Sequence, residues 1–130
     1  DECWCIEENR PYPLLKKSVI EVMNIYAQEH ERFSCIHHTD FRLNKYGVSG
    51  FMSSHVDNIH HSHGQSYGYP QCSVLLFLND DYGGGEFIVA NKKYETKRGS
   101  AIIFPSNFMF PHEVKEVTKG ERWSVVSWLM

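Results

Sequence analysis

The sequence predicts a mainly β domain, a sandwich or jelly roll, with one N-terminal helix packed on a sheet. From residue 41 onward, short apolar runs are separated at regular intervals by Gly, Asn and Asp, which is typical of antiparallel β structures. Before that point the apolar residues instead recur with helical spacing. The chain has 130 residues, the length of one small domain, so we expect a single domain over residues 1–130.

The helix is predicted over residues 13–30. Its apolar residues recur at steps of three and four with Lys and Glu between them, and they are Leu15, Val19, Val22, Met23 and Tyr26. This spacing places them on one face of a helix. We expect that face to brace a β core that covers residues 41–130.

Eight short strands are predicted in the β core. They cover residues 41–46, 51–57, 73–79, 85–90, 94–97, 101–105, 111–117 and 121–129. The glycines at 83–85 predict a turn or bulge with positive φ where a strand begins. A phosphate-binding loop is the other interpretation, but the lysine and helix that complete a P-loop do not follow. Gly99 predicts a tight turn before a buried strand.

Composition excludes several classes of protein. Lys and Arg number 13 against 16 Asp and Glu, for a formal net charge of −3 without a basic run, which argues against a nucleic-acid binder. No apolar run approaches the ~18 residues that span a membrane, and no signal peptide is expected within these residues. The cysteines are too irregularly spaced for a zinc site, so free thiols in a reducing cytoplasm are predicted; they are Cys3, Cys5, Cys35 and Cys72.

His55, Asp57 and His112 form a predicted metal site. Residues i and i+2 of a strand share a face, so His55 and Asp57 point together if 51–57 is a strand. His112 adds a second imidazole 55 residues after Asp57. Two histidines and a carboxylate leave positions on the ion open, as in non-haem Fe(II) oxygenases, whereas a closed four-ligand set would suggest structural zinc. The alternative is a surface HxD pair without metal.

Arg122 lies ten residues after His112, and on strand 121–129 it shares one face with Ser124, Val126 and Trp128. A guanidinium fork beside a hydroxyl suits the distal carboxylate of a dicarboxylic acid. A surface arginine in an ion pair is the alternative interpretation.

Nine sequence blocks resemble, in order, the prolyl 4-hydroxylase branch of the 2-oxoglutarate- and Fe(II)-dependent oxygenases, including similar enzymes of marine bacteriophages. The blocks are RLNKY at 42–46, HVD at 55–57, LNDD at 78–81, GGEF at 84–87, RGS at 98–100, FPS at 104–106, PHEV at 111–114, TKGER at 118–122 and Trp128. The resemblance implies a double-stranded β-helix, a jelly roll, with iron held by the triad. It implies that 2-oxoglutarate chelates the iron and places its 5-carboxylate on Arg122. O2 is the remaining cosubstrate, and ascorbate is a further candidate cofactor.

The resemblance also assigns neighbours of the cosubstrate. It places the Tyr46 hydroxyl within reach of 2-oxoglutarate and Trp128 near the metal, although core packing would explain both residues. At Phe77 the oxygen-sensing hydroxylases carry a tyrosine whose hydroxyl contacts the cosubstrate, so that hydrogen bond is missing here. Ser124 or Tyr46 is expected to substitute for it.

Residues 58–71 follow the first two predicted ligands and are rich in His, Tyr and Gly. A His-rich tract is itself a metal-binding composition, and its histidines are His60, His61 and His63. We favour instead a polar loop beside the active site that meets the substrate. Tyr67, Tyr69 and Pro70 would then offer contacts to a peptide.

The sequence thus predicts a dioxygenase that hydroxylates a substrate, releasing succinate and CO2, with a prolyl residue of a peptide or protein as the favoured target. A nucleobase or small metabolite is the second candidate substrate, and a non-enzymatic jelly-roll binding module is the remaining alternative. No membrane partner is expected. The phage-like resemblance favours the cytoplasm of a bacterial or phage-infected cell.

Overall fold

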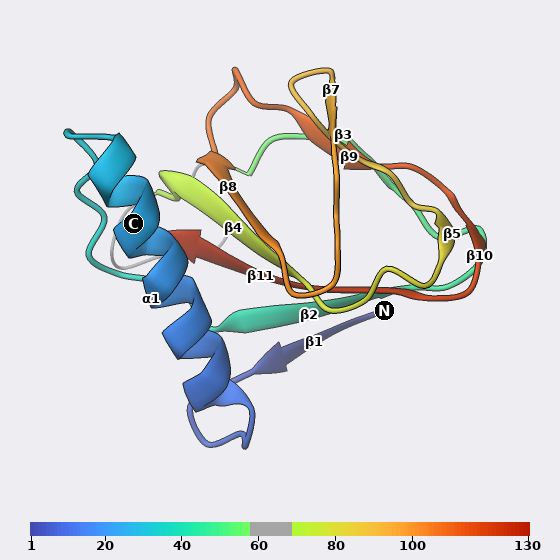
Figure 1. Cartoon of the computed structure of the whole chain (residues 1–130), viewed down its shortest axis with the longest axis horizontal. Coiled ribbons are helices and arrows are strands. Elements are labelled where there is room, and N and C mark those ends of the chain that lie inside the picture. Colours follow the sequence, from blue (N-terminus) through green and yellow to red (C-terminus); the bar gives the residue numbers. More distant parts are fainter. Residues whose placement is uncertain (58–68) are drawn as a thin grey trace.

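The computed structural model describes residues 1–57 and 69–130 and shows a mainly β protein built from antiparallel sheets and one helix (Figure 1). In chain order its elements are β1 (Glu2–Cys5), α1 (Tyr12–Glu29), β2 (Phe41–Tyr46), β3 (Met52–His55), β4 (Cys72–Phe77), β5 (Gly83–Gly84), β6 (Phe87–Val89), β7 (Lys92–Tyr94), β8 (Ala101–Pro105), β9 (His112–Val114), β10 (Val117–Lys119) and β11 (Arg122–Leu129). The prediction of a mainly β fold is confirmed.

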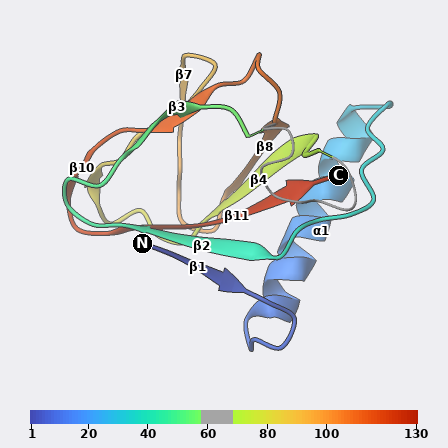
Figure 2. The same ribbon diagram turned by 180° about the vertical axis from the view of Figure 1, so that it is seen from behind.

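The larger sheet has five strands in the order β1-β2-β11-β4-β8, and the smaller sheet has four in the order β3-β9-β6-β7. Seen from behind, β1 lies along the edge of the larger sheet beside β2 (Figure 2). The central strand β11 pairs with β2 on one side and with β4 on the other. Strands from both ends of the chain, β1 and β11, therefore belong to the same sheet.

One hydrophobic core joins α1 to the outer face of the larger sheet. Leu15 and Val19 of the helix are buried against a cluster that includes Val74, Leu76 and Val125. Because side chains alternate between the faces of a strand, the intervening residues of β4 and β11 point to the opposite side. The predicted helix at 13–30 begins and ends one residue earlier in the structure, at Tyr12–Glu29.

A second core fills the space between the two sheets. It combines Leu75 and Phe77 of β4 with Phe87 of β6 and Val114 of β9. The alternation along β4 thus serves both cores at once, and all six residues of that strand are buried. This inner core ends where polar side chains replace the apolar ones, which defines the site described below.

The predicted strand at 51–57 is shorter in the structure. β3 ends at His55, which pairs across the sheet with His112. Asp57 lies beyond the strand in a bend, because β9 begins at His112 and offers no partner further along. The same-face argument for His55 and Asp57 was therefore wrong in its geometry, although the two side chains do converge.

Other differences arise where backbone conformation, and not hydrophobicity, sets the boundary. The predicted strand at 94–97 lies earlier, at Lys92–Tyr94, because β6 and β7 form a tight hairpin. Its two loop residues, Ala90 and Asn91, both have positive φ, as a type I′ turn requires. The edge strand β1 (Glu2–Cys5) was not predicted at all.

One predicted strand is divided in the structure, and another is shortened. The segment 111–117 separates into β9, which stays in the four-stranded sheet, and β10, which begins at Val117 and pairs with β5. The segment 85–90 is reduced to β6 at Phe87–Val89, and β5 (Gly83–Gly84) precedes it within the glycine segment that was predicted as a turn or bulge. The small ribbon of β5 and β10 closes one end of the space between the sheets.

Within the described residues, no helix combines the length and the apolar character that crossing a membrane requires.

Gly84, in the ribbon of β5 and β10, is a position where only glycine fits. Its φ is +68°, and an added Cβ would overlap the backbone carbonyl oxygen of Glu116, which no side-chain rotation can relieve. The neighbouring Gly85 also has a positive φ, of +64°. The prediction was a turn or bulge with positive φ. The positive φ is confirmed at Gly84 and Gly85, and the register of the β5–β10 pair shifts there, between Val117 and Lys119.

We expect Gly84→Ala to destabilise the fold by more than the roughly 1–2 kcal/mol that a left-handed backbone costs an alanine, because the backbone overlap adds to it. Gly99→Ala should cost about the conformational penalty alone, since φ is +79° but no atom lies within 4 Å of the added Cβ. Gly47→Ala, with open space around its Cβ, should be close to neutral. Urea unfolding of the three variants measures this order, and equal losses would contradict it.

Candidate active site

His55, Asp57 and His112 converge at one end of the space between the sheets. Nε2 of His55 lies 3.3 Å from Oδ1 of Asp57, and Nε2 of His112 lies 3.3 Å from Oδ2 of the same carboxylate. The ligand atoms of all three residues lie within 4.8 Å of one another. Neighbouring donors on an octahedral ion with bonds of ~2.1 Å lie roughly 3 Å apart, so these three side chains fit a small divalent metal on one face.

Backbone carbonyls orient both imidazole rings. Nδ1 of His55 lies 2.8 Å from the carbonyl oxygen of Ser53, and Nδ1 of His112 lies 3.3 Å from that of Phe110. A carbonyl can only accept, so each Nδ1 carries a proton. Nε2 donates to Asp57 when its ring is also protonated there, and it becomes the ligating atom when a metal takes the place of that proton. The β3–β9 pairing that places His55 opposite His112 brings the rings to a centroid distance of 4.2 Å.

Ser73 orients the carboxylate of Asp57. Its hydroxyl donates a hydrogen bond of 2.6 Å to Oδ2, and the buried hydroxyl of Ser106 lies 2.8 Å from that of Ser73. Burial alone raises the pKa of Asp57, but the hydrogen bonds from His112, His55 and Ser73 outweigh it and hold the pKa well below its usual value. The carboxylate is therefore ionised. Its hydrogen bond in turn raises the pKa of His55.

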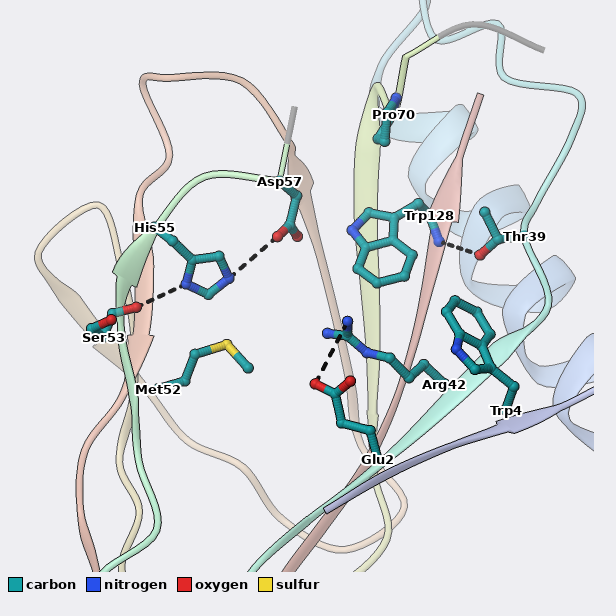
Figure 3. Close-up of a pocket in the computed structure, with 10 residues that line it drawn as sticks. All are labelled: Glu2, Trp4, Thr39, Arg42, Met52, Ser53, His55, Asp57, Pro70 and Trp128. Carbon is teal, nitrogen blue, oxygen red and sulfur yellow. Dashed lines mark hydrogen bonds and ion pairs between the residues drawn. The ribbon is translucent and has the colours of Figure 1, made fainter. Parts of the chain in front are cut away.

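An outer cavity of about 520 Å³ opens beside the triad (Figure 3). Its wall is formed by Glu2, Trp4, Thr39, Arg42, Met52, Ser53, His55, Asp57, Pro70 and Trp128. Figure 3 shows His55 and Asp57 on one side of this cavity and the aromatic side chains of Trp4 and Trp128 on the other. A ligand held in this cavity would lie beside His55 and Asp57 and would pack against a mostly apolar wall.

A narrow inner cavity leads from the triad to Arg122, between the sheets. Its free volume is about 20 Å³, room for about one water molecule. A larger ligand requires side chains at its mouth to move. Met52 lines both cavities, and its unbranched, flexible side chain suits that adjustment.

Arg122 is buried without an ionic partner. It is 1% exposed, and among residues 1–57 and 69–130 no carboxylate lies within ion-pair distance of it. Nη1 donates to the Ser124 hydroxyl at 3.3 Å, while Nε and Nη2 have no acceptor. Burial lowers the pKa of Arg122, and Tyr82 and Tyr46 oppose that change. A buried guanidinium with unused donors is the arrangement expected of an anion-binding site.

Aromatic rings surround this guanidinium. Its carbon lies 5.3 Å from the ring centre of Tyr46, 5.6 Å from that of Phe77 and 5.9 Å from that of Phe87. The hydroxyl of Tyr46 donates to the sulfur of Met52 at 3.8 Å. Phe77 stands beside Arg122 without a hydroxyl, as the sequence indicated.

The structure therefore brings together every residue of the predicted site, namely His55, Asp57, His112, Arg122, Ser124 and Tyr46, with Trp128 between the two cavities. Sequence reasoning missed Ser73 and Asn44. The side chain of Asn44 is buried, its Oδ1 has no partner, and it lines the inner cavity. For Ser73, a polar residue between apolar neighbours in a strand was the available signal; Asn44 lies beside Lys45 in a mixed strand and carried none.

Part of the predicted substrate loop lies outside the described residues. His60, His61, His63 and Tyr67 fall there, so the proposed competition for metal is not tested. Pro70 is buried and lines the outer cavity, while Tyr69 is exposed. All four cysteines are free thiols, as predicted.

Two groups of curated proteins are similar in sequence. Human prolyl 3-hydroxylase 2 is 41% identical over 70 residues, which cover 48% of this chain and 10% of the human protein. A PKHD-type hydroxylase of Prochlorococcus marinus is 35% identical over 100 residues, which cover 72% of this chain and 42% of that protein. The chain thus spans less than half of the length of these relatives.

Solved structures share the fold at lower identity. The viral collagen prolyl hydroxylase of Paramecium bursaria Chlorella virus 1, solved with 2-oxoglutarate, has a TM-score of 0.77 at 17% identity, covering 99% of this chain and 78% of that chain. A prolyl hydroxylase of Trichoplax adhaerens, solved with a peptide of hypoxia inducible factor, has a TM-score of 0.77 at 21% identity, covering 99% and 61%. The predicted jelly-roll fold is confirmed.

The family described as the 2OG-Fe(II) oxygenase superfamily matches residues 41–130, which contain the triad, Arg122 and every strand of the two facing sheets except β1. The resemblance drawn from the nine sequence blocks is confirmed by this match. The chain belongs to the 2-oxoglutarate- and Fe(II)-dependent oxygenase superfamily.

Proposed function

We propose that this protein is an Fe(II)- and 2-oxoglutarate-dependent dioxygenase that hydroxylates a prolyl residue in a peptide or protein. One observation carries the proposal: a metal-ligand triad and a buried, unpaired arginine lie at opposite ends of one cavity. That arrangement suits a ligand that binds a metal with one end and carries a carboxylate at the other.

The donor set of the triad fits Fe(II). Nε2 of His55, Nε2 of His112 and the Asp57 carboxylate would hold the ion on one face, leaving the remaining positions open. Iron and 2-oxoglutarate, when bound, supply oxidative decarboxylation by O2, which yields succinate and CO2 and delivers one oxygen atom to the substrate. The carbonyls of Ser53 and Phe110 keep both imidazoles in the ligating tautomer.

The larger sheet would bind the rest of the cosubstrate. Arg122 would pair with the 5-carboxylate, and Ser124 and Tyr46 would offer hydroxyl groups beside it. Phe77 and Phe87 exclude water from this end of the cavity, which strengthens the charge interaction in a medium of low dielectric. The sequence difference at Phe77 then removes one hydrogen bond without removing the charge partner.

The outer cavity supports a peptide substrate. Trp4, Pro70 and Trp128 provide apolar surface beside the triad, and an extended proline-containing segment loses little entropy on docking to such a surface. The names of the relatives point the same way, since they include a prolyl 3-hydroxylase and several prolyl hydroxylases of similar fold.

The metal site can be tested with a graded series. We expect His112→Ala to abolish one-to-one Fe(II) binding, and Ser73→Ala to weaken it about 10- to 100-fold because the Asp57 carboxylate loses its orienting hydrogen bond. Ser127→Ala removes another buried hydroxyl, bonded to Thr39 instead, and should leave affinity unchanged. Anaerobic calorimetry measures all three. Undiminished Fe(II) binding by His112→Ala would contradict the assignment of His112 as a metal ligand.

Substitution of Arg122 should change the affinity for 2-oxoglutarate without lowering the stability of the fold. Arg122→Met should lose about 2–5 kcal/mol of 2-oxoglutarate binding free energy and keep metal binding. The fold should be as stable or more stable, because an apolar side chain replaces a buried unpaired charge. Arg122→Lys should restore part of the affinity.

Titration of 2-oxoglutarate into the anaerobic Mn(II) form, together with thermal unfolding, decides this point. Lys45→Met serves as the control, because it removes a cation paired with Glu121 at 3.1 Å on the outer surface. Unchanged cosubstrate affinity in Arg122→Met would assign the distal carboxylate to another residue.

The reaction itself is tested by succinate release with and without proline-containing peptides. We expect stimulation of succinate release and a gain of one oxygen atom on proline, with fragmentation of the product distinguishing C3 from C4 of the ring. Stimulation by a nucleoside or a free metabolite alone would reject the prolyl target and keep the oxygenase chemistry. Absence of any 2-oxoglutarate consumption would favour a binding module.

A further inference from the structure

Arg42 stands at the junction of the two cavities. It lies on β2 with its side chain on the inner face, and it lines both the inner and the outer cavity together with His55 and Asp57. Figure 3 shows its guanidinium group between Trp128 and Met52, pointing into the cavity that His55 and Asp57 also line. The roles proposed for the metal ligands and for Arg122 leave this side chain without a function.

The guanidinium of Arg42 has one ion pair among the described residues. Its partner is Glu2, at 3.7 Å from Nη1, which is too long for a hydrogen bond. Nε is buried and has no acceptor in the described part of the chain. The Arg42 side chain is 20% exposed and that of Glu2 is 53% exposed, so Glu2 is the more solvent-exposed partner of this pair.

Trp128 fixes the orientation of this guanidinium and adds a donor. The guanidinium carbon lies 4.8 Å from the ring centre of Trp128, a stacking distance that holds the planar group in place. Trp4 supports the indole from a centroid distance of 6.3 Å. The indole Nε1 of Trp128 is also buried without an acceptor. One wall of the outer cavity thus carries two kinds of unused donor beside the triad.

We propose that Arg42, assisted by Trp128, binds a carboxylate of the substrate, so that the protein selects proline-containing peptides with a carboxylate close to the target proline. The inference rests on the proposed function. A carboxylate accepts hydrogen bonds through two charged oxygens and matches the guanidinium fork, whereas an amide offers a single neutral oxygen and a cation offers no acceptor. Glu2 occupies the position weakly and gives way to the substrate.

The carboxylate has two chemical sources. It is either the side chain of an acidic residue next to the proline or the C-terminal carboxylate of a peptide that ends near it. Both present the same two oxygens to Arg42. They differ in whether amidation of the peptide C-terminus removes the effect.

The test measures peptide binding by calorimetry to the anaerobic protein with Mn(II) and 2-oxoglutarate, which needs no turnover. Three peptides share one proline-containing sequence: one with glutamate beside the proline and an amidated end, one with glutamine there and an amidated end, and one with glutamine and a free carboxylate directly after the proline. The variants are Arg42→Gln, Glu2→Gln and Lys45→Gln. Lys45 is the matched control, on the same strand and facing outward to Glu121.

We expect wild-type protein to bind one of the carboxylate peptides about tenfold or more tighter than the neutral peptide, the effect of a hydrogen bond to a charged group. Arg42→Gln should abolish this preference and keep the affinity for 2-oxoglutarate. Lys45→Gln should retain the preference. Glu2→Gln should increase it by a few fold, because an exposed competing ion pair is removed.

Equal binding of all three peptides by the wild type, or a preference that survives Arg42→Gln, would overturn the inference. Loss of 2-oxoglutarate affinity in Arg42→Gln with the peptide preference intact would also overturn it and place Arg42 with the cosubstrate. If the proposed function is wrong but this inference is right, the carboxylate peptides would bind with the expected preference and would gain no oxygen atom.

Discussion

The candidate site depends on one buried positive charge, that of Arg122, which has no ionic partner among the described residues. An isolated buried charge is costly, and every element around this arginine lowers that cost without supplying a counter-ion. The rings of Tyr46, Phe77 and Phe87 face the guanidinium, and Ser124 accepts one hydrogen bond. Gly85 leaves room for the side chain, since an added Cβ would lie 3.1 Å from Cδ of Arg122. Gly85, which directly follows β5, therefore serves the same site as the arginine.

The two sheets contribute different residues to the candidate site. The smaller sheet carries both imidazoles on paired strands, and the larger sheet carries the positive charge on its central strand, β11. Asp57 belongs to neither sheet, and the hydroxyl of Ser73 on β4 fixes its carboxylate. The distance between the metal ligands and Arg122 is consequently set by how the inner faces pack, with Leu75, Phe87 and Val114 as spacers.

The sequence was sufficient for the fold class, because that depends on periodicity. It also named the residues that the structure brings together at the candidate site, because residue type and the family resemblance pointed to them. His55, Asp57, His112 and Arg122 carry chemistry that few other arrangements require. Strand boundaries were less accurate, because pairing partners far along the chain decide them. β3 ends where β9 offers no further partner, and the Ala90–Asn91 turn lacks the glycine that usually marks such a hairpin. Ser73 was hidden for a related reason, since its partner Asp57 is adjacent only in the folded chain.

The buried side-chain polar atoms that lack a partner in the described part of the chain are concentrated around the inner cavity. In the described part of the chain, five buried side-chain nitrogen and oxygen atoms lack a partner, and they belong to Arg42, Asn44, Arg122 and Trp128. All four residues lie on β2 and β11 and line the inner cavity. Each such atom costs about 1–3 kcal/mol when buried, a cost that a core built only for stability would avoid. Proteins tolerate such departures chiefly at functional sites, and a ligand that satisfies these atoms stabilises the folded state as it binds. The same unpaired atoms that weaken the empty fold are therefore the ones that make it a binding site.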